Sequence, residues 1–419
     1  MKKLLQKLSR TCFGSKWFAI IIVVAVYFAI SFYKVYLTKN LPQYDSKDDT
    51  DFYWTEEAFQ YRYAKMVANG EKISEIDYKA QYPEGVYVYK DLTIFMEKIH
   101  GIIYRIFLKN TGMSFSQFLI YFVSFFSSIS IIAVFFITKE LWNNHLAGLM
   151  SSAFYSISLA TITRTIGAYE YENFALPFIF FSLYFFLKSI NSKSNFYLIG
   201  SAVCLSVALI SWHFTRFYFL LFTIIVTALF FLYYPNIVSL VKSFVFIVIF
   251  CIITGIINPV LQTTSFLLSP AMLISYGLIV TYIFRHYIYF NRKLMFLFFA
   301  FVVITAVIVS NIFLEQKGYS HVYDLFIYKT LNFLKKPELP SQLPYSARFL
   351  WIEAFNSTAL LRIIYFFLIV LLFALPGLFK SVKDIIKQKL TLDKTMFLFL
   401  AISWGLLYLY VERLVVFFI

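Results

Sequence analysis

Apolar runs of membrane-spanning length recur along the whole chain and limit what it can fold into. Of the 419 residues, 60% are hydrophobic and only 14% are charged. About 20 apolar residues cross a bilayer as a helix, because a helix satisfies its own backbone hydrogen bonds in lipid. The sequence therefore predicts an all-α polytopic membrane protein. The eleven predicted spans are 17–35, 115–138, 146–162, 173–189, 196–212, 215–233, 237–257, 264–284, 294–314, 359–379 and 395–418.

The basic residues predict how these spans are oriented. The net charge is +15, but the basic side chains stand in loops that alternate along the chain, as the positive-inside rule requires. This distribution favours an integral membrane protein with a cytoplasmic N-terminus and argues against nucleic-acid binding. The first span has no small-residue cleavage site, so we expect a retained anchor. The predicted inner loops carry Lys139, Lys188, Lys193, Arg285, Arg292, Lys293, Lys380, Lys383, Lys387, Lys389 and Lys394.

Two long segments lie on the outer side in this topology. Residues 45–91 hold half of the 22 acidic residues, and we expect most of them to be solvated. Residues 58–67 are predicted to form a helix, and residues 92–107 an amphipathic helix lying against the membrane. The predicted organisation is a single transmembrane domain over residues 1–419, with outer loops at about 38–114 and 315–358.

A pair of glutamates stands in the short predicted loop between two spans. Glu170 and Glu172 lie within residues 163–173, at the membrane edge, where carboxylates are costly to place. A divalent cation, Mn²⁺ or Mg²⁺, would account for them, because hard cations take oxygen ligands and offset the repulsion between like charges. The alternative is that both glutamates are structural partners of Arg164.

Other ionisable side chains fall on the same predicted face. Glu56 lies in the first outer loop, at about 38–114. Glu353 lies in the other long outer loop, at about 315–358, which is the fifth outer loop along the chain. Arg413 lies near the outer end of the last span. Carboxylates, a metal and an arginine together suit chemistry on a lipid-borne phosphate. The alternatives are a solvated acidic loop for Glu56 and an arginine that snorkels to the headgroups for Arg413. His213 and Arg216 are predicted to be interfacial anchors.

The residues around Glu56 resemble the first-loop motif of oligosaccharyltransferase catalytic subunits, a family of membrane glycosyltransferases with the GT-C fold. In that family an aspartate is followed by aromatic residues and a Tyr-Arg or Leu-Arg pair. Here Glu56-Glu-Ala-Phe-Gln-Tyr-Arg62 has the same spacing, with glutamate in place of aspartate. Asp51, in Asp-Phe-Tyr-Trp, has the family's side-chain type and is the alternative first-loop acid. We favour Glu56 because its spacing matches without a gap.

Three further motifs extend the resemblance. Thr163-Arg-Thr-Ile-Gly-Ala-Tyr-Glu-Tyr-Glu172 is similar to the family's Ser-Arg-Ser-Val-Ala-Gly-Ser-Tyr-Asp-Asn-Glu pattern, which ends in metal-binding acids. Arg348-Phe-Leu-Trp-Ile-Glu353 looks like the fifth-loop motif that ends in a functional glutamate. Val411-Glu-Arg-Leu414 resembles the stretch with the late arginine that contacts the donor pyrophosphate.

The resemblance implies a GT-C bundle and a metal-dependent glycosyltransferase. Such an enzyme moves a glycan from a polyprenyl-(pyro)phosphate donor to an acceptor on the outer face of the membrane, and in the family the acceptor is a protein or peptide. The matched positions assign Glu56 and Glu353 as catalytic residues. They assign Glu56, Glu170 and Glu172 as ligands of Mn²⁺ or Mg²⁺, and Arg413 as the donor-phosphate group.

The chain also departs from the family. The family's last two spans and C-terminal soluble domain, with its Trp-Trp-Asp-Tyr-Gly acceptor motif, have no counterpart here. We therefore expect either a fragment or a different means of acceptor recognition. Two other functions remain open: a GT-C transferase that uses a polyprenyl-phosphate monosaccharide, and a lipid-glycan transporter or flippase. Transporters place ionisable residues near the membrane midplane, whereas these acids lie at one edge, which favours an enzyme.

Overall fold

The computed structural model of the chain divides into two compact units. The first comprises Met1–Ile157, Thr161–Phe219 and Val238–Leu267, and the second comprises Ser158–Ala160, Leu220–Ile237 and Leu268–Ile419. The structure describes residues 16–45, 52–53, 56–192, 194–234, 237–287, 291–313, 320–352, 355–359, 361, 363–364, 372, 376–384 and 390–411.

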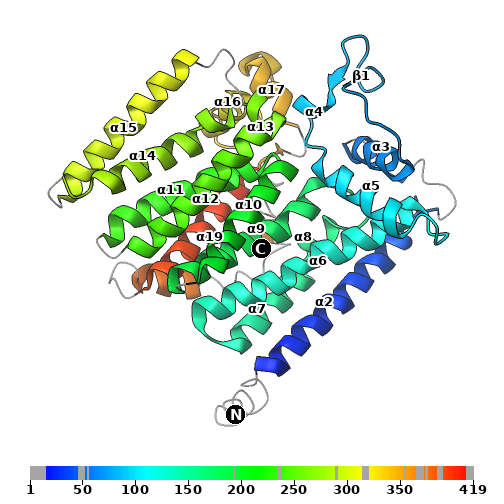
Figure 1. Ribbon diagram of the computed structural model, residues 1–419, viewed down its shortest axis with the longest axis horizontal. Helices are drawn as coiled ribbons and strands as arrows, with labels where there is room; N and C mark the ends of the chain where they lie inside the picture. The colour runs from blue at the N-terminus through cyan, green and yellow to red at the C-terminus, as the bar shows by residue number, and fades with distance from the viewer. Residues whose placement is uncertain are drawn as a thin grey trace. The chain divides into compact units, whose positions relative to one another are not determined.

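Long apolar helices pack side by side in the first unit, each against its neighbour in space (Figure 1). Each has an apolar surface too long to leave in water, so lipid and neighbouring helices must cover it. The packed pairs are α2 (Lys16–Lys39) with α6 (Phe115–Trp142) and α7 (His145–Ile157), α6 with α9 (Tyr171–Asn191), α9 with α10 (Asn195–Ser211), and α10 with α12 (Val238–Ile257).

Small and polar side chains bring these helices together. Ser182 on α9 and Ser201 on α10 each donate a hydrogen bond to the other's backbone carbonyl, both at 2.9 Å. Hydroxyl groups of this size allow backbones to approach closely inside a membrane. At the C-terminal ends of α6 and α9, the Lys188 ammonium lies 2.7 Å from the Glu140 carboxylate. These two helices therefore run in the same direction, with their ends paired.

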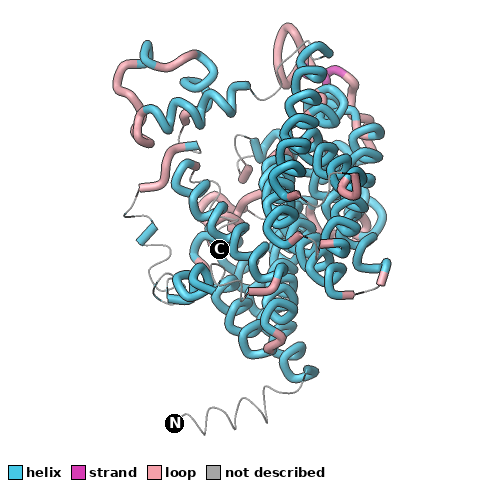
Figure 2. Tube along the Cα trace, turned by 90° about the vertical axis from the view of Figure 1, so that its left-hand side faces the viewer, coloured by secondary structure: helices cyan, strands magenta, loops and turns pink. Residues whose placement is uncertain are grey.

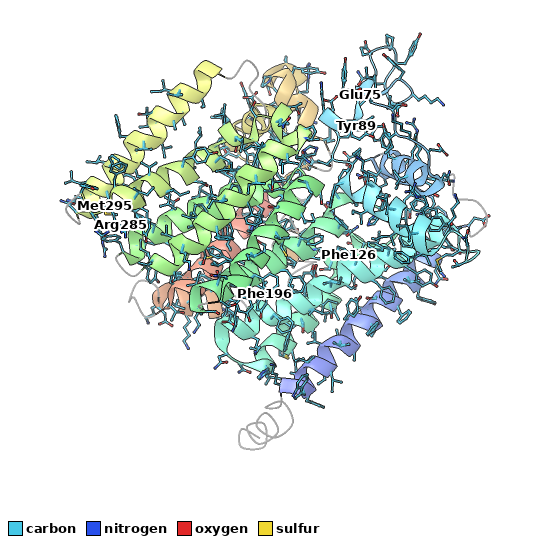
Figure 3. All side chains as sticks on the ribbon, in the orientation of Figure 1. Glu75, Tyr89, Phe126, Phe196, Arg285 and Met295 are labelled. Atoms are coloured by element: carbon cyan, nitrogen blue, oxygen red, sulfur yellow. The ribbon has the colours of Figure 1, made fainter. Side chains whose placement is uncertain are left out.

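A segment of mixed structure connects α2 to α6. Within it, Asp77 attaches a two-stranded antiparallel hairpin to the preceding helix, since its carboxylate accepts from Arg62 and Tyr63, both at 2.8 Å. Figure 3 labels Glu75 and Tyr89 at this hairpin. The elements of the segment are α3 (Glu56–Asn69), β1 (Ile76–Asp77), β2 (Val86–Tyr87), α4 (Val88–Asp91) and α5 (Phe95–Phe107).

Helices α3 and α5 approach each other closely at Gly101. A Cβ atom at this position would lie 2.6 Å from Val67 Cβ and 2.7 Å from the Ala64 carbonyl oxygen, both on α3. These separations are shorter than any side chain tolerates, so only glycine allows the observed spacing. The two predicted helices of the first outer loop are therefore present and form one tightly packed pair.

The second unit is also helical among its described residues, and Figure 2 shows strand only in the hairpin of the first unit. In it, α14 packs on α15 and α16 packs on α17. Helix α11 continues from the first unit into the second.

The elements of the two units whose bounds have not yet been given are α8 (Leu159–Thr163), α11 (Thr215–Tyr233), α13 (Pro259–Thr263), η1 (Phe266–Leu268), α14 (Pro270–Phe284), α15 (Arg292–Phe313), α16 (Ser320–Leu331), η2 (Pro340–Gln342), α17 (Tyr345–Leu350) and α19 (Leu392–Tyr410).

Seven of the described helices are long and apolar enough to cross a membrane, and α10 and α14 are shorter apolar helices. Two predicted spans differ from the structure. The run 146–162 is broken at Ser158 into α7 and α8, and the run 264–284 becomes a helix only from Pro270, where proline suits the first helical turn. The predicted span 359–379 lies largely outside the described residues, so the count of eleven stays a prediction.

Candidate active site

The predicted acidic loop follows α8 and runs into the first turn of α9, and we call residues 164–173 the carboxylate turn. Gly167 has a φ of +67°, a conformation that glycine adopts without strain. Its amide donates to the Thr38 hydroxyl of α2 at 3.2 Å, and the Asn173 side-chain amide donates to the Arg164 carbonyl at the same distance. The turn is thus closed on itself and attached to the end of α2.

Arg164 lies against both glutamates of the carboxylate turn. Its Nη1 is 3.8 Å from Glu170 Oε1, and its Nε is 3.6 Å from Glu172 Oε1. The Glu172 side chain is 0% exposed, whereas Glu170 and Arg164 are 17% and 30% exposed. One guanidinium therefore offsets part of the charge of two carboxylates. The structure therefore contains the ion pairs expected if both glutamates are structural partners of Arg164.

Tyr169 attaches the carboxylate turn to α5. The Nδ1 atom of His100 lies 2.8 Å from the Tyr169 hydroxyl, and the tautomer of the imidazole decides which of the two donates. Both side chains are buried. The Tyr169 ring packs beside Tyr53, and the His100 ring lies 4.4 Å from that of Phe122 between their centroids. Burial lowers the pKa of His100 to about 3, so its ring is neutral at physiological pH.

Tyr171 contacts α5 one turn earlier. Its side chain lies close enough to the Glu97 carboxyl to influence the pKa of that group. Glu97 is 0% exposed, and burial raises its pKa to about 8. A carboxyl in such surroundings keeps its proton at neutral pH, because a buried charge has lost its hydration. Glu170 therefore lies between two tyrosines that are each held by a buried ionisable side chain of α5.

Glu56 is the first residue of α3 and is exposed. Its charge has a small electrostatic influence on Tyr171, and the role of Glu56 beside Glu170 and Glu172 stays a prediction. A helix N-terminus stabilises a negative charge at this position. Arg62, the last residue of the first-loop motif, is paired with Asp77 and has a structural contact there.

Three of the predicted site residues, Asp51, Glu353 and Arg413, lie outside the described residues. Their roles stay predictions. The segment that carries Glu353 is nevertheless attached at its described positions, because the buried Lys329 ammonium donates to the Phe355 carbonyl and to the Tyr410 carbonyl at the end of α19.

The described residues fit a metal ion only in part. Glu170 and Glu172 supply two carboxylates, but no group of three or more His, Cys, Asp or Glu side chains that could hold an ion occurs among the residues described. Hard cations take six or more oxygen ligands, and Mg²⁺ keeps several of its waters. A complete site would need water, substrate or residues beyond those described.

Sequence reasoning missed the buried residues Glu97 and His100. Both belong to the predicted amphipathic helix, and their three-residue spacing places them on the same face as Gly101. That glycine was the available signal, since it marks the buried side of the helix. Arg216 was predicted to be an interfacial anchor, but it is only 7% exposed and donates to the Thr264 hydroxyl at 2.7 Å.

Comparison with known proteins gives one family and one group of similar folds. Residues 13–401 match the family model Dpy19, described as Q-cell neuroblast polarisation. Dpy19 is a GT-C family related to the oligosaccharyltransferases, so the resemblance seen in the sequence is confirmed.

Solved structures of an archaeal oligosaccharyltransferase have a similar fold. The enzyme AglB from Archaeoglobus fulgidus, in complex with an inhibitory peptide and a dolichol-phosphate, superposes with a TM-score of 0.66 at 15% identity. Its apo form gives the same values, and a form tethered to an acceptor peptide containing an NVT sequon gives 0.63 at 16% identity. The matches cover 96% of this chain and 48–49% of those chains, so this chain spans about half their length.

Proposed function

Because the chain belongs to the Dpy19 family of GT-C glycosyltransferases, we propose that it transfers a glycan from a polyprenyl-(pyro)phosphate donor to an acceptor on the outer face of the membrane. The dolichol-phosphate and the peptides bound by the similar archaeal structures support a lipid-linked donor and a peptide acceptor. The observation that carries the proposal is the carboxylate turn, in which Glu170 and the buried Glu172 are held at the start of a membrane helix.

The proposed reaction is a displacement at the anomeric carbon of the glycan. The acceptor atom forms the new bond, the bond between the anomeric carbon and the phosphate oxygen breaks, and the phosphate leaves with the electron pair. The acceptor proton passes to a carboxylate. We assign this role to Glu56 together with Glu353, and we assign Arg413 to the leaving phosphate, since a guanidinium pairs well with phosphate oxygens.

We keep the proposed metal set as Glu56, Glu170 and Glu172, with Mn²⁺ or Mg²⁺. Such an ion would supply positive charge opposite the leaving phosphate. Without an ion, Arg164 would be the positive group beside Glu170 and Glu172.

The test of this proposal is a transfer assay on purified protein in lipid nanodiscs with a radiolabelled polyprenyl-linked glycan. Glu170→Gln and Glu172→Gln should each lower transfer by about 100-fold, the usual cost of removing a group that stabilises transition-state charge. Glu75→Gln is the matched control, because Glu75 is an exposed acid at the hairpin (Figure 3). Equal activity in all three variants would contradict the proposal.

The side of the membrane is tested separately, in a variant without native cysteines. A cysteine in place of Ala168 should react with an impermeant thiol reagent added outside cells, and one in place of Lys380 should not. The reverse labelling would place the carboxylate turn in the cytoplasm and would remove the proposed outer-face reaction.

A second candidate function is favoured by Arg164. One guanidinium already lies within 4 Å of both glutamates, so the turn itself carries a cation where a metal ion would act. A polyprenyl-phosphate monosaccharide leaves with less negative charge than a pyrophosphate donor, so this cation offsets more of it. The second candidate is therefore a GT-C transferase that moves one sugar from a polyprenyl monophosphate.

The two candidates differ in donor and in metal requirement. The assay uses the same labelled hexose on polyprenyl phosphate and on polyprenyl pyrophosphate, each with EDTA or with Mn²⁺. Transfer from the pyrophosphate donor that stops in EDTA supports the first candidate. Transfer from the monophosphate donor that continues in EDTA supports the second, and transfer from neither contradicts both.

A further inference from the structure

The buried face of α5 carries two ionisable side chains that the proposed reaction does not use. Glu97 and His100 are 0% and 1% exposed, so neither reaches a substrate. A buried carboxyl or imidazole costs folding free energy unless its partners compensate. Both residues belong to α5, which packs mainly on α3 and also contacts α6 and α10.

Both side chains contact the same short stretch of the carboxylate turn. His100 meets the Tyr169 hydroxyl at 2.8 Å, and Glu97 lies close to Tyr171, which influences the pKa of its carboxyl. These tyrosines are the residues on either side of Glu170. Glu170 has an extended backbone (φ −107°, ψ 150°) and immediately precedes Tyr171, the first residue of α9. Because both of its neighbours lie against side chains of α5, the direction of Glu170 depends on these two contacts.

The remainder of the surroundings is apolar and close-packed. The His100 ring lies in edge contact with Phe122 and Phe174, at centroid distances of 4.4 and 5.4 Å, and Tyr169 is completely buried. Buried polar groups in such packing have few alternative partners, so each contact specifies one orientation of the turn. A shape-preserving substitution can remove the polar atom and leave the packing.

We propose that Glu97 and His100 are positioning residues, which fix the direction of Glu170 by holding Tyr171 and Tyr169. The proposal rests on the proposed function, because it assigns Glu170 to the reacting site. Glu97 acts through the carboxyl group that faces Tyr171, and glutamine offers that phenol the same acceptor oxygen. Leucine fills a similar volume and offers none.

The first arm of the test measures turnover in the lipid-linked transfer assay. Glu97→Leu and His100→Phe should lower kcat by about 10- to 100-fold with little change in the KM for donor, the usual result when a reacting group is displaced by a fraction of an ångström. Glu97→Gln should stay within about twofold of wild type, because it restores the acceptor for Tyr171. Lys98→Gln, on the same helix beside Tyr89, is the matched control.

A double mutant separates positioning from general loss of stability. If Glu97 acts through Tyr171, then Glu97→Leu combined with Tyr171→Phe should lose no more kcat than either single variant. Losses that add would contradict the proposal. An equal loss in Glu97→Gln and Glu97→Leu would also overturn it, because only the carboxyl charge would then matter.

The second arm measures hydrogen exchange and requires no activity. Amides of residues 169–173 should exchange at least about 10-fold faster in Glu97→Leu than in Glu97→Gln, since the anchored turn loses a contact. If the turn loosens in this way while the wild type transfers no glycan, the proposed function fails and the positioning contacts stand. If exchange and turnover are both unchanged in Glu97→Leu, the positioning role is wrong.

Discussion

The carboxylate turn of the first unit and residues 351–358 of the second unit each include an acidic motif, yet they are attached through different atoms. The carboxylate turn is held mostly by side chains that contact side chains, in addition to hydrogen bonds of the Gly167 amide and the Arg164 carbonyl. His100 holds Tyr169, Glu97 holds Tyr171, and Arg164 lies against both glutamates. Its shape therefore depends on the identity of each of these residues.

Residues 351–358 have several polar attachments through their backbone, beside the buried Trp351 side chain and the Thr358 hydroxyl, which donates to the Tyr408 carbonyl. Lys329 donates to the Phe355 and Tyr410 carbonyls, and Lys336 donates to the Trp351 carbonyl at 2.5 Å. The Thr358 amide donates to the Leu409 carbonyl at 3.2 Å, which adds a contact with the end of α19. Every residue has a backbone carbonyl, so these attachments do not depend on which side chain the segment carries.

This difference separates two ways to build a site. A turn held by its side chains has a fixed composition, and substitution of any partner changes its geometry. A segment attached largely through its backbone depends less on its own polar side chains and more on the lysines that reach it. The first kind of site should be sensitive to substitutions within the motif, and the second to substitutions far from it.

The largest effect is expected at Arg164. Breaking a wholly buried ion pair costs about 3–5 kcal/mol, and because the Arg164 side chain is 30% exposed we expect Arg164→Met to cost about 2 kcal/mol. The variant leaves the buried Glu172 without its guanidinium. The measurement is the thermal unfolding midpoint in nanodiscs. Arg164→Met with Glu172→Gln should recover most of the loss, and failure to recover would show that Arg164 acts otherwise.

An effect of the same size is expected at Lys329. Lys329→Met leaves two carbonyls without their donor, and each unsatisfied buried acceptor costs about 1–3 kcal/mol. We expect a loss of about 2 kcal/mol in unfolding free energy, together with faster amide exchange in residues 355–358. Lys335→Met is the control, since Lys335 is an exposed neighbour. Equal stability of both variants would contradict the backbone attachment.

A smaller effect is expected in the pH dependence of stability. Burial raises the pKa of Glu97 from 4.5 to about 8, so the folded state holds a proton that the unfolded state has lost, and stability falls as pH rises between these values. Burial lowers the pKa of His100 from 6.5 to about 3, so its effect has the opposite sign and is confined to pH below 6.5. Between pH 6.5 and 8, only the Glu97 effect remains of these two.

The measurement is the unfolding midpoint at pH 6.5 and pH 8. It should fall in the wild type over this interval, and Glu97→Gln should remove most of the fall, because glutamine does not titrate. A wild-type midpoint that rises, or an equal fall in Glu97→Gln, would contradict the assignment of a neutral Glu97.

The smallest effect is expected at Arg62. Its ion pair with Asp77 joins side chains that are 36% and 8% exposed, and partly exposed pairs contribute about 0.2–1 kcal/mol. Arg62→Gln should shift the unfolding midpoint only slightly and leave glycan transfer unchanged. A large loss of transfer would show that the last residue of the first-loop motif acts in the reaction, as its place in the motif suggests.

Much of the membrane part could be predicted from the sequence, because hydropathy alone identifies segments that lipid must surround. The predicted span 215–233 coincides with α11, and 237–257 differs from α12 by one residue. Prediction failed where polar groups or prolines interrupt an apolar run. The Ser156 hydroxyl donates to the Ala153 carbonyl near the end of α7, and hydropathy averaged over a long window does not detect such a break.

The candidate site was predictable only where its contacts are local. Arg164, Glu170 and Glu172 are close in sequence, so the residue order alone suggests their pairing as an alternative to a metal site. His100 and Tyr169 are 69 residues apart, and no periodicity in either segment indicates that they meet. Glu97 was overlooked because an acidic residue on an amphipathic helix is ordinarily solvated.

The glycine contact between α3 and α5 has a mechanical consequence. Backbones that meet as closely as those at Gly101 cannot slide or rotate independently, because any relative motion would bring Val67 and Ala64 into collision with α5. Glu56 begins one helix, and Glu97 and His100 belong to the other. If Glu56 contacts the acceptor as proposed, a displacement of α3 would be carried to α5 and from there to Tyr169 and Tyr171. The proposed acceptor contact and the proposed direction of Glu170 would then be coupled.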